Sequence, residues 1–101
     1  MDRLNTLLKT CLEGYTGRAL NGYSYLTSSA DDRKHTVISV GQLPDKRIVD
    51  ASLIVHVVGD RIVIERDVND RPLVDALQQA GVERQQIVLA YAGEPVDEPV
   101  A

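Results

Sequence analysis

Cysteine and the larger aromatic residues are scarce in this chain, which has one cysteine, four tyrosines and neither tryptophan nor phenylalanine. The single cysteine, Cys11, excludes a disulfide within the chain and a metal site built from several cysteines. No stretch approaches the roughly 20 apolar residues that a helix needs to cross a bilayer. The first residues, 1–5, have no apolar run behind their charges and do not resemble a leader peptide. We therefore expect a cytoplasmic protein without a membrane partner.

Basic residues are also in the minority, because fifteen acidic residues stand against eleven basic ones and the net charge is −4. The average electric field of such a chain repels phosphate backbones, so the composition disfavours autonomous binding to nucleic acid. Direct DNA binding stays open as an alternative if basic and aromatic residues gather near the ends of the sheet. The candidates are Arg18, Arg33, Lys34, Lys46 and Arg47, with Tyr15, Tyr23 and Tyr25 as stacking surfaces.

The remaining composition is typical of a soluble globular protein, with 44% hydrophobic and 26% charged residues among 101. A chain of this length forms one modest core and leaves no room for a separate catalytic domain. We expect a single domain over residues 1–92. The segment 93–101 is acidic and contains proline, so we expect a flexible tail there.

Two segments have the periodicity of amphipathic helices. Apolar residues recur at steps of three and four from Leu4 to Tyr15, which predicts a helix over about residues 2–12. A second helix is predicted over about residues 70–80, with Pro72 in its first turn and Gly81 at its end. The polar residues before it, Asp67, Asn69 and Asp70, are interpreted as helix caps, because proline and glutamine replace the glycine and glutamate of a calcium loop.

β-Branched and aromatic residues predict strands at 23–27, 36–40, 47–58, 61–67 and 87–91, the first of them at an edge and the last buried on both faces. Gly59 and Asp60 form a two-residue hairpin signal between the third and fourth. The predicted fold is a single α+β domain with a mostly antiparallel sheet, two helices on one face, and the order α-β-β-β-β-α-β.

The predicted hairpin around Gly59 and Asp60 sorts its side chains onto two faces. The register pairs Val58 with Arg61 and, further along, Ile54 with Glu65. One face is wholly apolar and is assigned to the core under the helices: Leu53, Val55, Val57, Ile62 and Ile64. The opposite face mixes β-branched, charged and histidine side chains and is the candidate partner interface: Ile54, His56, Val58, Arg61, Val63 and Glu65. Exposed strand residues without a partner, or a homo-oligomer, would also explain this mixture.

No set of residues predicts a catalytic, cofactor or metal site. His56 and Glu65 lie diagonally across the hairpin like a base and its orienting group, but no nucleophile is placed beside them, so an enzyme is the least favoured hypothesis. Cys11 falls on the apolar stripe of the first helix and is interpreted as a core residue. His35 follows a charged turn, where we expect a solvated cluster.

Several segments resemble the XisI family in order, spacing and length, over roughly nine-tenths of the chain. These are the leading segment from Leu4 to Tyr15, Arg47-Ile48, the strand 53–58 with its turn, residues 61–65, Asp67, Ala76-Leu77, Gly81-Val82 and the strand 87–91. The sequence departs from the family at Val63 and Gln42, where tryptophan is usual, and at Ile54 and His56, where histidine and aspartate are usual. It also lacks the longer family tail.

The resemblance implies a non-enzymatic factor that controls excision of a genomic DNA element. It implies a XisH-like protein, which looks nuclease-like, and a recombinase as partners, with the recombinase carrying out the strand chemistry. Two alternatives stay open beside this one, a direct DNA-binding protein and an antitoxin-like partner of a nuclease-like protein.

Overall fold

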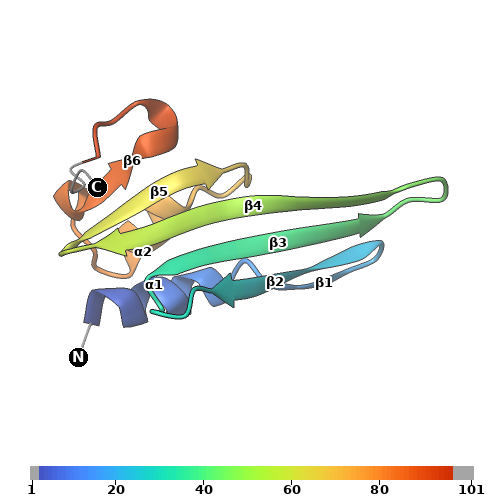
Figure 1. Ribbon diagram of the computed structural model, residues 1–101, viewed down its shortest axis with the longest axis horizontal. Coiled ribbons are helices and arrows are strands. Elements are labelled where there is room, and N and C mark those ends of the chain that lie inside the picture. The colour runs from blue at the N-terminus through green and yellow to red at the C-terminus, as the bar shows by residue number, and fades with distance from the viewer. Residues whose placement is uncertain (1–2, 97–101) are drawn as a thin grey trace.

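The computed structural model describes residues 3–96 and has two α-helices and six strands (Figure 1). The first half contains α1 (Arg3–Glu13), β1 (Gly17–Ala19), β2 (Gly22–Ser28) and β3 (Lys34–Gln42). The second half contains β4 (Arg47–Val58), β5 (Arg61–Asp67), α2 (Leu73–Gln79) and β6 (Ile87–Leu89), with 3₁₀ turns η1 (Arg84–Gln86) and η2 (Ala90–Ala92) on either side of β6. The predicted α+β class with a mostly antiparallel sheet is confirmed.

The six strands form one sheet in chain order, β1-β2-β3-β4-β5-β6. Every neighbouring pair is antiparallel except β5 and β6, which are parallel because α2 carries the chain back between them. Gly59 takes a left-handed φ of 61° in the β4–β5 turn. This conformation is easy for glycine, and it confirms the predicted hairpin.

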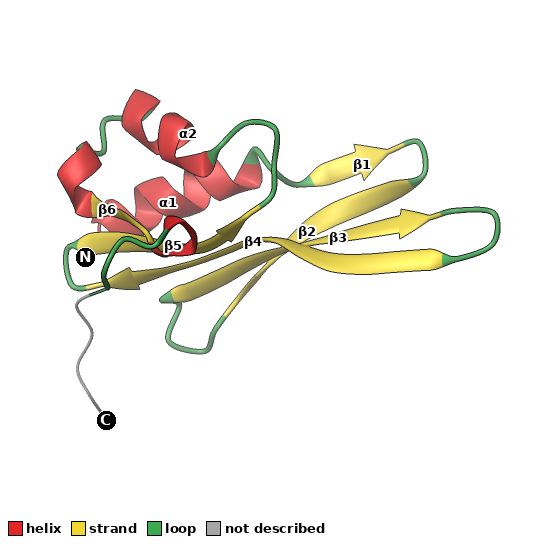
Figure 2. Ribbon diagram, turned by 90° about the horizontal axis from the view of Figure 1, so that it is seen from above, coloured by secondary structure: helices red, strands yellow, loops and turns green. Residues whose placement is uncertain are grey.

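The core lies between one face of this sheet and the two helices, which lie on the same side of it (Figure 2). Leu8 and Leu12 of α1 and Leu73 and Leu77 of α2 are fully buried, as their helical spacing predicts. The strands contribute all five residues of the apolar face predicted from the hairpin: Leu53, Val55, Val57, Ile62 and Ile64.

The predicted order of elements missed β1, a three-residue strand that is exposed throughout. It is a hairpin arm at the sheet edge, and a short exposed segment between glycines carries no alternation of apolar and polar residues. As a result, the predicted strand around Tyr23 is not at the edge. It lies between β1 and β3. The last strand also ends earlier than predicted, at Leu89, where the chain turns into η2.

Two irregularities in the pairing of β4 with its neighbours, at Ser52 of β4 and at Glu65 of β5, change which residues lie opposite one another. Between Val37 and Ile38 the pairing with β4 skips Ser52, so beyond this bulge the even-numbered residues Asp50 and Ile48 take the helix side of the sheet. The second irregularity, between Ile54 and Val55, shifts the pairing with β5. Ile54 therefore pairs with Arg66, and the predicted pairing of Ile54 with Glu65 is wrong.

The sheet extends well beyond the helices, so that the molecule measures 44 × 30 × 27 Å. The helices cover the end that contains β5 and β6, whereas β1 and the far halves of β2, β3 and β4 project past them (Figures 1 and 2). We call this projecting part, residues 17–25 and 38–50, the arm. Its side chains are more exposed than those of the covered end, and Leu20, Ile48 and Val49 are 98%, 42% and 54% exposed.

Two carboxylates hold the segments before α2 and after β6 in place through hydrogen bonds. Asp67 accepts hydrogen bonds from the backbone N–H of Leu73, at 2.7 Å, and from Asn69, so of the three predicted caps it is the one that bonds the first turn of α2, which begins at Leu73 and not near Asp70. Glu94 accepts bonds from the N–H of Leu89 at 2.8 Å and from Arg84 at 2.6 Å. Glu94, at the start of the segment predicted as a flexible tail, is therefore hydrogen-bonded to the domain, and residues 97–101 lie outside the described part of the chain. Within residues 3–96, no helix is long and apolar enough to cross a membrane.

Candidate interaction surfaces

The face of the sheet opposite the helices, which we call the outer face, carries the residues predicted as a partner interface. Arg61 and Glu65 are exposed, and Ile54, His56 and Val58 are half-buried. Val63 differs, because it is only 1% exposed. Its neighbours in the sheet are His56 and Val88, and the η2 segment after β6 packs against β5. The prediction that Val63 lies open to a partner is therefore wrong.

His56 and Glu65 form the pair predicted from the hairpin. His56 Nε2 lies 3.1 Å from Glu65 Oε2, and the side chains are 18% and 41% exposed. Lys34 of β3 stands beside His56 in the register, so this end of the outer face carries charges of both signs. Mixed charge beside half-buried aliphatic side chains is typical of a protein interface that selects its partner by complementarity.

The outer face continues onto the arm, where it becomes aromatic and apolar. The register places Tyr25, Ile38 and Ala51 side by side, and Tyr23, Val40 and Val49 in the next row. The two tyrosine rings stack with centroids 6.0 Å apart, and each side chain is about two-fifths exposed, at 41% and 42%. Half-exposed tyrosines on a sheet are enriched at protein interfaces.

His35 was expected in a solvated cluster, but it lies beneath α1 and is 1% exposed. Its Nδ1 is 2.7 Å from Ser28 Oγ, and its Nε2 is 2.8 Å from Asn5 Oδ1. The Asn5 amide donates to Asp32, which fixes its oxygen toward the imidazole. Burial lowers the pKa of His35 below its ordinary value. This histidine ties α1 to the β2–β3 hairpin, and it does not reach the surface as a binding group.

Cys11 is half-buried between the helices, as predicted from its place on the apolar stripe, and its Sγ lies 3.9 Å from the carbonyl oxygen of Ala76. Burial raises the pKa of its thiol, and the nearby Arg71 opposes this shift. A thiol kept protonated is a poor nucleophile, which fits a packing role.

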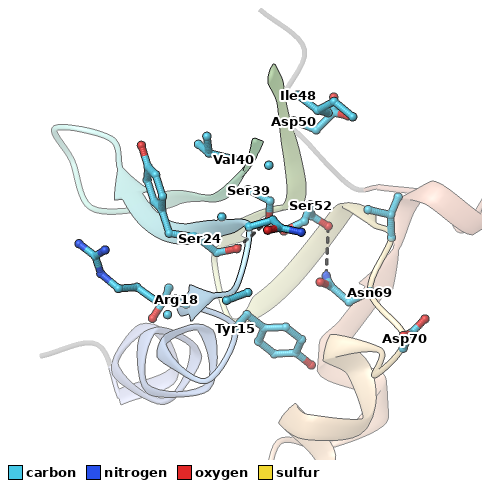
Figure 3. A pocket seen from close by; sticks show the side chains of 18 of the residues that line it. Tyr15, Arg18, Ser24, Ser39, Val40, Ile48, Asp50, Ser52, Asn69 and Asp70 are labelled. Carbon is cyan, nitrogen blue, oxygen red and sulfur yellow. Dashed lines mark hydrogen bonds between the residues drawn. The ribbon is translucent and has the colours of Figure 1, made fainter. Parts of the chain in front are cut away.

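A groove opens on the helix side of the arm, beyond the ends of α1 and α2 (Figure 3). Its volume is about 980 Å³. Its floor consists of small and polar residues of β2, β3 and β4, including Ser24 and Ser39, whose hydroxyls hydrogen-bond at 2.8 Å. Its walls are the segment from Gly14 to Leu20 on one side and residues 68–71 on the other.

Three arginines line this groove, and two aspartates accompany them. Arg71 stacks on the Tyr15 ring, with its guanidinium carbon 4.7 Å from the ring centroid, while the Tyr15 hydroxyl donates to the Arg71 carbonyl at 2.9 Å. Arg66 Nε donates to the carbonyl of Ala51 at 2.7 Å. Among residues 3–96, none of these arginines, Arg18 included, forms an ion pair with a carboxylate.

Sequence reasoning did not find the groove, because its walls come from segments about fifty residues apart, around residues 14–20 and 66–71. One signal was available. In β2 and β3 the residues facing the helix side change from Leu26 and Val37 to Ser24 and Ser39, and then to Gly22 and Gly41. Small and polar residues replace the apolar stripe where the helices end.

A six-stranded sheet with two helices on one face, ending in a parallel β-α-β unit, defines a small α+β protein whose outer face and groove have the features of binding surfaces. The sequence matches the family XisI, described as XisI protein, over residues 1–98. This chain belongs to the XisI family. No curated protein matches the sequence.

Solved structures from Anabaena variabilis share the fold. A XisI-like protein is 20% identical and superposes with a TM-score of 0.65 over 85% of this chain and 78% of its own. The fdxN element excision controlling factor XisI is 17% identical, with a TM-score of 0.65 over 86% of this chain and 88% of its own. At these identities the likeness concerns the fold.

Proposed function

We propose that this protein controls excision of a genomic DNA element and does so without catalysing strand exchange, by binding a protein of the excision machinery through the outer face of its sheet. Membership of the XisI family and the likeness to a fold relative named as an excision controlling factor support the role. The partner proposed is a XisH-like protein, a recombinase, or both.

The observation that carries this proposal is the composition of the outer face. It combines the hydrogen-bonded pair of His56 and Glu65 with a row of aliphatic side chains and two partly exposed tyrosines, and neither helix covers it. Protein interfaces have apolar and aromatic residues at the centre and charges at the rim. The excess of acidic residues favours a protein over a phosphate backbone as the target of this surface.

An excision assay in cells tests the role. A plasmid would carry the element between its recombination sites, with the recombinase and the XisH-like gene supplied, and quantitative PCR would measure the rejoined junction. We expect the junction yield to change at least about tenfold when this chain is expressed. An unchanged yield under all combinations of the supplied genes would disprove the excision role.

Outer-face variants test the surface in the same cells. Reversal of two exposed charges, Arg61→Glu with Glu65→Lys, keeps the core intact and should abolish both co-purification with the partner and the change in junction yield. The matched control reverses two exposed charges on α1, away from both the outer face and the arm, Arg3→Glu with Glu13→Lys. If the double variant behaves like wild type, the outer face does not bind the partner. A shift of labelled element DNA by the purified chain at physiological salt would instead favour direct DNA binding.

A further inference from the structure

The groove on the helix side of the arm is a second exposed feature, and the proposed function makes no use of it. It lies on the opposite side of the sheet from the outer face (Figure 3). Its volume of about 980 Å³ is at the upper end of ligand sites, which span roughly 300–1,000 Å³. Such sites enclose most of a small molecule, whereas this groove is open along its length, a shape that suits an extended chain.

The charges of the groove indicate an anionic occupant. Arg71 is held in place, because its guanidinium stacks on Tyr15 and lies so close to Gly14 that a Cβ there would be 3.4 Å from Nη2. An arginine fixed by packing has already lost much of its side-chain entropy, so it binds a carboxylate at lower cost. Within the described part of the chain no carboxylate pairs with it.

Two further guanidinium groups point to the same chemistry. Arg18 lies on the exposed strand β1 without an ion pair among residues 3–96, and Arg66 uses Nε for the Ala51 carbonyl, which leaves both of its Nη groups available. A guanidinium with two free N–H groups binds a carboxylate through parallel hydrogen bonds. The hydroxyls of Ser24 and Ser39 on the floor add donors and acceptors suited to peptide groups.

The two aspartates that line the groove favour a peptide over a nucleic acid as its occupant. Asp50 and Asp70 line the groove, and their side-chain carboxylates form no hydrogen bond or ion pair among the described residues. A nucleic acid carries a negative phosphate at every residue and is repelled by these carboxylates, whereas a peptide can place carboxylates at the arginines and other residues at the aspartates. We infer that this groove is a docking site for an extended, acidic peptide segment of a partner protein.

The test starts from the purified full-length chain and a phage-displayed library of random 12-residue peptides. We expect the selected peptides to be enriched in aspartate and glutamate. The most enriched peptide, synthesised with a fluorescent label, should bind with an affinity that falls as salt rises, because exposed ion pairs are screened. Selected peptides without acidic enrichment would overturn the inference.

Matched variants locate the binding. Arg71→Gln with Arg18→Gln should weaken binding of the labelled peptide at least about tenfold, as expected for losing charge-assisted hydrogen bonds. Arg61→Gln removes the same charge from the outer face and should change the affinity by less than about twofold. Equal losses in both variants, or tighter binding of a 12-nucleotide single-stranded DNA that displaces the peptide, would overturn the inference.

Two controls keep the outcome decisive. Circular dichroism melting checks that each variant folds. If Arg71→Gln does not fold, Arg18→Gln alone carries the test, because this exposed side chain forms no hydrogen bond or ion pair among residues 3–96 and its loss should still weaken binding about threefold or more. The groove variants and the outer-face variants change different residues, so a negative result for peptide binding does not alter the result of the excision assay.

Discussion

The end of the sheet under α1 and α2 and the arm beyond them are built from the same strands, but their side chains have opposite environments. Under the helices, Leu53 and Val55 of β4 are buried to 0% and 1% exposure. Further along the same strand, Ile48 and Val49 are 42% and 54% exposed. Both ends of this strand are rich in β-branched residues, which favour an extended backbone whether or not a helix covers them. The covered end contains most of the buried core, and the arm exposes its side chains to solvent.

The bulge at Ser52 is the boundary between these two regions. It moves Asp50 and Ile48 to the helix side of the sheet, where a continued register would have placed Val49. The helix side of the arm therefore carries serines, glycines and an aspartate beside the single large apolar side chain of Ile48, in place of the continuous apolar stripe found under the helices. This change in chemistry is what creates the groove.

The largest expected effect is the loss of a core side chain at the covered end. Leu53→Ala should lower the free energy of unfolding by about 2–5 kcal/mol, because it leaves a cavity among fully buried residues. The matched substitution on the arm, Ile48→Ala on the same strand, should cost less than about 1 kcal/mol. Urea denaturation of both variants measures the difference. Equal losses would mean that the arm is as tightly packed as the core.

The next effect tests what holds α2 over the sheet. Asp67→Ala removes the acceptor for the N–H groups of Leu73 and Asn69 and should cost about 1–2 kcal/mol. Asp70→Ala is the control, because this neighbouring aspartate makes no hydrogen bond among the described residues, and it should stay within about 0.5 kcal/mol of wild type. A cost at Asp70 equal to that at Asp67 would contradict the assignment of the cap.

A smaller effect follows from the buried histidine that joins α1 to the sheet. Burial lowers the pKa of His35, so the folded state favours the neutral imidazole and the unfolded state binds more protons near pH 6. Its contribution is complete above the unfolded pKa of about 6.5 and is lost as pH falls toward the folded pKa. The urea midpoint should therefore drop from pH 7.5 to pH 5.5. In His35→Gln this part of the drop should be absent, and an equal drop would contradict it.

The smallest effect is expected at the tip of the β1–β2 hairpin. Leu20 is 98% exposed, so Leu20→Ser should change the free energy of unfolding by less than about 0.5 kcal/mol. Thermal melting together with light scattering at high protein concentration measures it. A lower melting temperature would show that the arm contributes to stability. Reduced light scattering at an unchanged melting temperature would support a role of the arm as a contact surface between molecules.

Features that depend on neighbouring residues could be predicted from the sequence, and features that depend on contacts between distant segments could not. Helical spacing located α1 and α2, and the Gly59-Asp60 signal located the β4–β5 hairpin with most of its register, because both patterns are local. Val63 and His35 were misplaced for a common reason. Burial of Val63 depends on β6 and the segment after it, and burial of His35 depends on Asn5 of α1, which lies thirty residues away.

The sequence by itself determined that this chain forms one small α+β domain, since periodicity and turn residues act over a few neighbours at a time, and its match over residues 1–98 places it in the XisI family. Only the tertiary structure decided where the surfaces lie. A single bulge at Ser52 reverses the facing of half a strand, and the groove exists because residues from distant segments meet around it. Such contacts arise from packing, and packing depends on the whole chain.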